Sequence, residues 1–339
     1  MSTDAYARAG VNIDAGNLAV QKYRDVTASW THPDQLGSLG GFNGLFRLPG
    51  DSKRALVGSA DGVGTKLLIA AALERYDTVG ADLVNHCVND ILVTGADPLF
   101  FLDYLAVGKL DAELAALVVS GVHRACRENG CALLGGETAE MPGVYRPEHF
   151  DLAGTIVGLV ELDAMPDPNR VADGDAILGL PAVGLHTNGY SLARALIAED
   201  EYGQPFGEST YGDALLAPHP SYLAPVRAIR AVADVKSMAH ITGGGLLDNV
   251  PRTLPEHAKA VFEQTRWEVP AIMVELVRRG NLAFEERYRT LNMGVGYTLI
   301  VPFTDVDAAI AAAPQARVVG FVQPRRDDEP RVVVRPARG

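Results

Sequence analysis

The chain has 339 residues, of which 47% are hydrophobic, so it can bury a full core, and we expect it to divide into two domains. Its formal net charge of −12 at pH 7 argues against nucleic acid or an anionic membrane as the main partner, because both require a broad basic face. The 3 cysteines are odd in number and lack zinc-type spacing, which argues against a disulfide framework and a structural metal site and favours a reducing compartment. The N-terminus has no apolar signal core, and no run approaches the ~18 apolar residues of a membrane span, so we expect a cytoplasmic location.

The first 50 residues are expected to form a mobile, glycine-rich part of the N-terminal domain. Residues 36–44 read L-G-S-L-G-G-F-N-G, which is too rich in glycine to hold one conformation unaided. Two interpretations stay open, a mobile cover over a site and a disordered linker.

The stretch D-G-V-G-T-K at 61–66 is predicted to join a strand to a helix, because it follows an apolar run at 55–58 and precedes a helical pattern. Two glycines allow close backbone approach, the N–H groups at a helix start attract anions, Lys66 adds a charge and Asp61 can hold a hard cation. It is not a Walker loop, since Thr65 precedes Lys66. Phosphate binding is one interpretation, and an ordinary helix start without a ligand is the other.

Residues 82–93 show a helical repeat of apolar side chains and are predicted to form a partly buried helix. Asp82, His86 and Asp90 recur at i, i+4 and i+8 on the opposite sector, so we expect an acidic stripe that faces outward. The sequence G-A-D-P at 95–98 should end this helix before a strand at 99–107.

The rest of the first half predicts a helix, two strands and a domain boundary. Asp111 is a good N-cap for a helix that continues to Ala125. A strand at 131–134 should end in a small-residue loop at 135–142, a type of loop that often carries polar chemistry in α/β proteins. A long strand at 152–162 precedes an irregular, proline-containing stretch at 165–175, so we place the two domains at 51–170 and 171–339.

The second half repeats the pattern of strands followed by polar, glycine-rich loops. His186 lies in such a loop between a strand at 176–180 and a helix, as a site residue or as part of a capping loop. His240 precedes three glycines that can expose successive N–H groups to an anion. Arg289, ahead of a strand at 297–301, is either a phosphate fork or half of a surface ion pair. Residues 321–339 should form a peripheral strand and a loose tail.

Several common chemistries lack their sequence signals in this chain. No Ser-His-Asp order, reactive-cysteine context or G-x-G-x-x-G after a strand can be recognised. Carboxylates and glycine-rich loops remain, which is the chemistry of magnesium and phosphate.

Together, the motifs of this chain resemble those of the phosphoribosylformylglycinamidine cyclo-ligases, also called aminoimidazole ribonucleotide synthetases, of purine biosynthesis. The resemblance runs from Tyr6 to about Val334. Its motifs are A-G-V-x-I-D-A-G at 9–16, D-G-V-G-T-K-L at 61–67, C-V-N-D at 87–90, G-A-D-P-L-F-F-L-D-Y at 95–104, G-G-E-T-A-E-M-P-G at 135–143, H-T-N-G-Y-S-L at 186–192, H-I-T-G-G-G at 240–245 and Y-R-T-L-N-M-G-V-G at 288–296. One departure is Asn12, where the family pattern has Asp.

The resemblance implies an α/β fold of two domains with mixed sheets and flanking helices. The N-terminal domains would pair across a homodimer into a β-barrel, with ATP near that interface. The implied reaction is ATP-dependent ring closure of formylglycinamidine ribonucleotide to aminoimidazole ribonucleotide, ADP and phosphate. Other ATP enzymes of the superfamily, such as thiamine-monophosphate kinase, and a non-catalytic maturation factor that binds ATP are the alternatives.

The resemblance also implies roles for individual residues, and a superfamily signature, D-x-x-x-x-G-A-x-P, falls on Asp90, Gly95, Ala96 and Pro98. Magnesium ligands would be Asp61, Asp90 and Glu137. The catalytic set would be His186, Asn188, Asp61 and Asp90. ATP would contact Gly62, Gly64, Thr65, Lys66, Asn89, Gly95, Ala96, Pro98, Glu137 and Thr138. The substrate would contact His240, Gly243, Gly244, Gly245 and Arg289.

Overall fold

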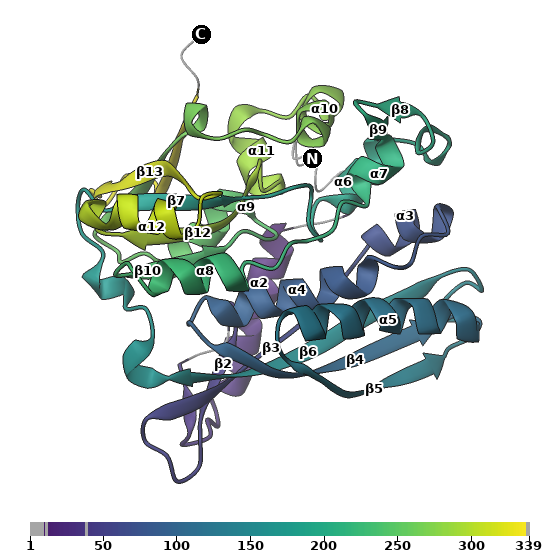
Figure 1. Ribbon diagram of the computed structural model, residues 1–339, viewed down its shortest axis with the longest axis horizontal. Coiled ribbons are helices and arrows are strands. Elements are labelled where there is room, and N and C mark those ends of the chain that lie inside the picture. The colour runs from purple at the N-terminus through teal and green to yellow at the C-terminus, as the bar shows by residue number, and fades with distance from the viewer. Residues whose placement is uncertain (1–9, 11–12, 38–39, 337–339) are drawn as a thin grey trace. The chain divides into compact units, whose positions relative to one another are not determined.

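The computed structural model describes residues 10, 13–37 and 40–336, without the side chains of residues 13, 14 and 17. The chain divides into two compact units (Figure 1), the first made of Met1–Met165 with Gly189–Ser221 and the second of Pro166–Asn188 with Tyr222–Gly339. Each contains a mixed six-stranded sheet with helices, which confirms the predicted α/β class with two domains. Asn12 lies outside the described residues. None of the helices in the described part of the chain has the length and apolar character needed to cross a membrane.

The sheet of the first unit is built around its longest strand, β6. The strand order is β1-β2-β3-β6-β4-β5, with β4 and β5 parallel and the other pairs antiparallel. The strands are β1 (Gln35–Leu36), β2 (Gly44–Arg47), β3 (Arg54–Gly62), β4 (Asp97–Val107), β5 (Ala132–Glu140) and β6 (Phe150–Glu161), and β8 (Pro205–Phe206) and β9 (Ser209–Thr210) form a separate hairpin. The helices are α2 (Ile13–Thr27), α3 (Lys66–Ala72), α4 (Val79–Leu92), α5 (Ala112–Glu128), α6 (Tyr190–Leu196) and α7 (Tyr211–Leu215).

One face of this sheet carries helices and forms the core of the unit. Figure 1 shows α4 and α5 lying along the same face, and α4 packs on β3 and β6. Successive side chains of a strand point to opposite faces, so every second residue of β6 and several residues of β3 and β4 are buried beneath these helices. The residues buried there include Val57, Phe101, Leu105, Leu152 and Ile156.

The second unit has the strand order β10-β12-β7-β13-β11-β14. Only β11 and β14 are parallel. The strands are β7 (Ala176–Pro181), β10 (Ser237–His240), β11 (Ala258–Glu263), β12 (Val295–Val301), β13 (Arg317–Pro324) and β14 (Val332–Arg335). The helices are α8 (Leu223–Arg230), α9 (Gly245–Asn249), α10 (Ala271–Gly280), α11 (Phe284–Thr290) and α12 (Val306–Ala312).

The predicted elements around the first-unit motifs are confirmed. Strand β3, a short loop and helix α3 follow one another across residues 54–72, and Asp111 caps α5 by accepting hydrogen bonds from the backbone N–H groups of Glu113 and Leu114. Short 3-10 turns at Leu162–Ala164 and Pro168–Arg170 occupy the irregular stretch before β7.

One prediction about the strands was wrong. The small-residue loop expected at 135–142 is mostly strand, because β5 continues to Glu140 in parallel pairing with β4. Gly136 lies against Asp103 where a Cβ would collide, so the glycine permits this pairing instead of ending the strand. The peripheral strand predicted within residues 321–339 is confirmed, because β14 is the edge strand of its sheet, whereas β13 is internal.

Candidate active site

The acidic stripe of α4 is buried, which corrects the expectation that it faces solvent. Asp82 is 0% exposed, His86 4% and Asp90 6%. Nε2 of His86 lies 2.6 Å from a carboxylate oxygen of Asp61 at the end of β3 and 3.9 Å from one of Asp90. The hydroxyl of Ser59 donates to Asp90 at 3.2 Å. The structure therefore brings Asp61 and Asp90 together around one imidazole nitrogen.

His86 carries a positive charge in this cluster. Burial opposes the charged imidazole, but the hydrogen-bonded Asp61 and the charges of Asp90 and Asp82 outweigh it and raise the pKa of His86 to about 9. At neutral pH this cation lies between the two carboxylates and offsets one of their two negative charges.

Lys66 follows the loop at the start of α3, but its side chain points into the interior of the first unit. It is fully buried, its Nζ lies 2.6 Å from Asp82, and it donates to the carbonyl of Ala217 at 2.9 Å. The same nitrogen lies 5.7 Å from the centroid of the Tyr190 ring. Lys66 is therefore held in a buried ion pair beneath the loop.

The loop at 61–66 also contacts α6. The hydroxyls of Thr65 and Ser191 are 3.3 Å apart. Gly64 has a φ of 69°, a left-handed conformation that glycine adopts without strain. The loop thus owes its shape to contacts on both sides.

The side chain of Asn89 also makes hydrogen bonds within the first unit. Its side-chain amide donates to the carbonyl of Pro220 at 2.9 Å and lies 3.2 Å from Nε2 of His219, and the residue is 0% exposed. These contacts favour a structural role for Asn89, which holds the segment around Pro220.

A cavity of about 600 Å³ lies beneath the glycine-rich segment that precedes β2. Its lining includes Gly40, Gly41, Leu56, Ser59 and Val157. Asn43 next to it donates to the backbone carbonyl of Asp90 at 2.7 Å. The glycine-rich segment and the carboxylate cluster therefore share one region of the first unit.

The signature residues after Asp90 turn the chain from α4 into β4. The N–H of Gly95 donates to the carbonyl of Leu92 at 2.8 Å, and the φ of Gly95 is 80°. Ala96 is buried, and Pro98 is the second residue of β4. These residues fix the end of the helix that carries Asp90.

Glu137 and Thr138 lie apart from this cluster. In the sheet, Glu137 pairs with Tyr104, Tyr104 with Ala153 and Ala153 with Gly62, so two strands separate β5 from β3. Neighbouring strands are ~4.8 Å apart and successive side chains alternate, which puts Glu137 roughly 14 Å from Gly62 and on the sheet face opposite to that of Asp61. Within one chain, Glu137 is not placed to share an ion with Asp61 and Asp90.

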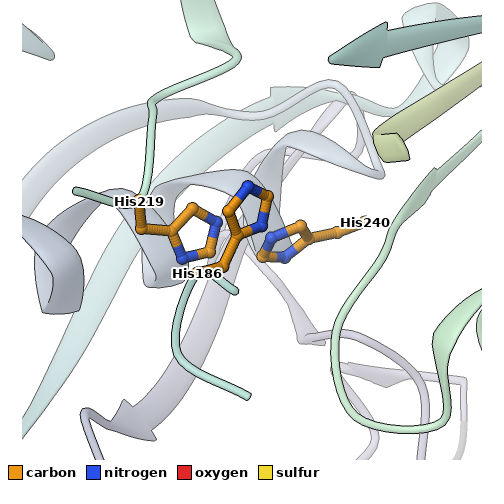
Figure 2. Close-up of side chains that lie close together, drawn as sticks. All are labelled: His186, His219 and His240. Carbon is orange, nitrogen blue, oxygen red and sulfur yellow. The ribbon is translucent and has the colours of Figure 1, made fainter. Parts of the chain in front are cut away.

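The predicted substrate residues gather in the second unit. Figure 2 shows the rings of His186 and His240, which have a ring nitrogen each within 4.8 Å of one another. His240 ends β10, whereas His186 lies in the loop after β7 with a φ of 64°. Both residues are buried, since His186 is 1% exposed and His240 is 0% exposed.

The glycine-rich loop after β10 lies beside the other predicted residues of this unit. A Cβ on Gly243 would come against the side-chain oxygen of Asn188. Arg289 donates from Nε to Asp248 of α9 at 3.2 Å, and Asp248 itself packs on Gly244. The structure therefore brings together His186, Asn188, His240, Arg289 and the glycines at 243–245.

Family models match nearly the whole described chain. The model described as AIR synthase related protein, N-terminal domain, matches residues 41–160, and that of the C-terminal domain matches residues 172–333. The chain belongs to the AIR synthase related protein family. A curated relative in this family, the phosphoribosylformylglycinamidine cyclo-ligase of Methylobacillus flagellatus, is 48% identical over 315 residues, which are 91% of this chain and 90% of the relative.

Solved structures with the AIR synthase related fold are more distant. The hydrogenase maturation protein HypE in complex with ATP is 21% identical with a TM-score of 0.65, and the match covers 86% of this chain and 84% of that one. Thiamine-monophosphate kinase from Stenotrophomonas maltophilia is 17% identical with a TM-score of 0.60, covering 92% of this chain and 93% of that one. At these identities the likeness shows the fold alone.

In this member of the AIR synthase related family, the sequence did not predict that His86 contacts both Asp61 and Asp90. The available signal was its spacing of four residues from Asp90, which puts both side chains on one face of α4. The contact with Asp61 could not be read from spacing, because it joins a helix to the end of a strand.

Proposed function

We propose that the protein is an ATP-dependent cyclo-ligase that converts formylglycinamidine ribonucleotide to aminoimidazole ribonucleotide, ADP and phosphate in purine biosynthesis. The observation that carries the proposal is the 48% identity to a curated cyclo-ligase over nearly the full length of both chains. The likeness to HypE and to thiamine-monophosphate kinase supports the fold only, so it favours neither maturation nor kinase activity for this chain.

The chemistry needs an activated formyl group. A formamide carbonyl is a poor electrophile and its oxygen a poor leaving group. Transfer of the γ-phosphoryl group of ATP to that oxygen corrects both faults, because the amidine nitrogen then attacks carbon and phosphate departs. In such a reaction the protein contributes mainly positioning and charge neutralisation.

Asp61 and Asp90 are the proposed magnesium ligands. Their carboxylates converge on one atom of His86, and carboxylate oxygens are the ligands that Mg²⁺ prefers, so this donor set fits the ion. When bound, magnesium would neutralise phosphate charge, which is worth several kcal/mol in the transition state. Glu137 is left out of this site because of its distant strand, and Glu137 and Thr138 are kept as predicted nucleotide contacts.

The loop at 61–66 is the proposed phosphate contact, through the backbone of Gly62 and Gly64 and the hydroxyl of Thr65. For Lys66, the ion pair with Asp82 favours a role beneath the loop over direct contact with phosphate. Gly95, Ala96 and Pro98 would act by fixing the end of α4.

The second unit is the proposed place of the ribonucleotide. His186 would polarise the formyl oxygen or move a proton, and Asn188 beside Gly243 would orient the substrate. His240, the glycines at 243–245 and Arg289 would receive the ribose phosphate. A charged side chain beside a glycine-rich loop suits a phosphate.

A homodimer is proposed from the helix-free face of the first-unit sheet. Leu102 and Tyr104 on this face are each 38% exposed, and Leu56, Val157 and Leu159 are only partly covered. Partly exposed apolar side chains in a row commonly mark a protein interface. A cytoplasmic location remains a proposal that rests on the free cysteines Cys87, Cys126 and Cys131 and on the place of the reaction in purine biosynthesis.

The proposed function is tested by ADP release with and without formylglycinamidine ribonucleotide, with imidazole formation followed in parallel. We expect ADP and imidazole to form together only when the ribonucleotide is present. A stable phosphorylated product would instead indicate a kinase, and ATP binding without substrate-dependent ADP release would indicate a maturation factor.

A further inference from the structure

A tyrosine that the sequence did not single out contacts the ring of His186 within the second unit. The hydroxyl of Tyr222, the residue before α8, lies 3.3 Å from Nε2 of His186 and donates to the backbone carbonyl of Pro181 at 3.0 Å. Both contacts are buried, since Tyr222 is 3% and His186 1% exposed. Tyr222 therefore connects the imidazole to the end of β7.

The direction of these two hydrogen bonds follows from the chemistry of the groups. A carbonyl oxygen only accepts, and a phenol has one proton to donate. Burial raises the pKa of Tyr222 well above its ordinary value, so the hydroxyl keeps that proton at neutral pH. With its proton directed to Pro181, the tyrosine oxygen accepts from His186, and the proton of the neutral imidazole belongs on Nε2.

The contact depends on a glycine of the N-M-G-V-G motif at 292–296. A Cβ at Gly296 would lie against the Tyr222 hydroxyl and against Cε1 of His186, at separations that no side chain tolerates. The register of β12 against β7 also shifts between Val295 and Tyr297. Gly296 thus provides the space in which the tyrosine and the histidine meet.

The backbone holds His186 in place at a cost. Its φ of 64° is left-handed, a conformation that is unfavourable for a residue other than glycine. Backbone hydrogen bonds fix the neighbouring segments. The N–H of Ile241 donates to the carbonyl of Gly296 at 3.0 Å, and the N–H of Ala182 donates to the carbonyl of Gly294 at 3.0 Å. A strained residue that its surroundings hold firmly indicates a functional constraint.

We propose that Tyr222 is a positioning residue that holds neutral His186 as the Nε2–H tautomer, so that Nδ1 is the atom that takes a proton during ring closure. This inference rests on the proposed cyclo-ligase function and decides between the two roles left open for His186. A neutral imidazole with its donor turned to Tyr222 accepts a proton at Nδ1, which makes it a base toward the amidine and not a donor to the formyl oxygen.

The tautomer is measurable without turnover. Long-range proton–nitrogen correlation spectra of the full-length protein with ¹⁵N-labelled histidine report which ring nitrogen is protonated, and comparison with His186→Gln identifies the signals of His186. We expect Nε2–H in the wild-type protein and a mixture of tautomers in Tyr222→Phe. For Tyr222→Phe, kcat should fall by about tenfold with both KM values nearly unchanged, a smaller loss than the ~10²-fold or more expected when a general base is removed.

Tyr288→Phe is the matched control, because Tyr288 is a buried tyrosine on α11 whose hydroxyl makes no hydrogen bond among the described residues. This variant should keep the wild-type tautomer and rate. A second disruptive variant, Gly296→Ala, should lose the Nε2–H preference as Tyr222→Phe does.

Two spectral results would overturn the proposal, an Nδ1–H tautomer in the wild-type protein and an unchanged tautomer in Tyr222→Phe. The wild-type spectrum decides even if a variant fails to fold. If His186→Gln turned over at the wild-type rate, His186 would not take part in the reaction, and its assignment as the base would be wrong. A failure of the cyclo-ligase proposal is seen separately, as a wild-type enzyme that forms no imidazole.

Discussion

The ammonium nitrogen of Lys66 lies 2.6 Å from a carboxylate oxygen of Asp82, and neither side chain is exposed. Burial lowers the pKa of Lys66 and raises that of Asp82, while each partner favours the charged form of the other. The lysine that a phosphate-binding motif would offer to a ligand is thus part of the interior, where it joins α3 to α4.

Lys66→Met should therefore destabilise the protein rather than weaken ATP binding alone. Removing one partner of a buried pair leaves an uncompensated charge and costs about 3 to 5 kcal/mol. Urea unfolding would measure the loss, with the exposed Lys53→Met as control, and a double variant with Asp82→Leu should recover part of it. If Lys66→Met kept the wild-type stability but bound ATP weakly, Lys66 would instead contact the phosphate groups of ATP.

Stability should fall at alkaline pH because of His86. Its pKa rises from 6.5 to about 9 on folding, so its stabilising contribution is fully present below about pH 6.5 and is lost as pH rises through about 9. The contribution is about 3 kcal/mol at most, from 1.36 kcal/mol per pKa unit. Urea unfolding without magnesium would follow the free-energy difference between wild type and His86→Gln across this range. A difference that stays constant from neutral to alkaline pH would show that His86 is not charged in the folded protein.

Asp90→Asn should reduce turnover by at least ~10²-fold without unfolding the protein, because the amide is a poor magnesium ligand. Turnover as a function of magnesium concentration, together with thermal unfolding, separates loss of the ion from loss of the fold. The exposed Asp163→Asn is the control for removing one carboxylate. Near-normal turnover of Asp90→Asn at low magnesium would refute the proposed role.

Local patterns sufficed for much of the fold. The apolar period of α4, the cap at Asp111 and the strand-loop-helix order around Asp61 all depend on residues close in sequence, where propensity and spacing act directly. Strand β5 was missed beyond Leu134 because its glycines weaken the local signal, whereas its pairing with β4 depends on a neighbour some thirty residues earlier.

The sequence indicates candidate site residues by their type, but it does not indicate most of the side chains that contact them. Polar, glycine-rich loops indicated Asp61 and the loop at 243–245, whereas the role of Asp90 on its helix came from the resemblance to the cyclo-ligase family. Two of the contacts that decide what these groups can do join different elements, His86 of α4 with Asp61 of β3 and Tyr222 with His186. Periodicity within one element carries no information about such contacts.

His186→Ala should leave ATP binding intact and slow ring closure, because the histidine lies in the second unit with the proposed substrate residues. A general base contributes ~10²-fold or more, so kcat should fall by about that factor. Equilibrium binding of ATP and single-turnover imidazole formation measure the two effects separately. A collapse of ATP affinity would place His186 in the nucleotide site instead.

Leu102→Glu should break the proposed homodimer. The side chain of Leu102 is 38% exposed on the helix-free face of the first-unit sheet, opposite the core residue Phe101. A carboxylate there stays solvated in a monomer, but it would have to be buried without a partner charge in a dimer formed through this face. Light scattering coupled to size-exclusion chromatography should give twice the chain mass for wild type and a single chain mass for the variant. Leu117→Glu is the matched control, since Leu117 is 50% exposed on α5, away from this face, and should leave the wild-type mass unchanged. A wild-type protein that elutes as a monomer, or a Leu102→Glu protein that still has the dimer mass, would rule out this face as the interface.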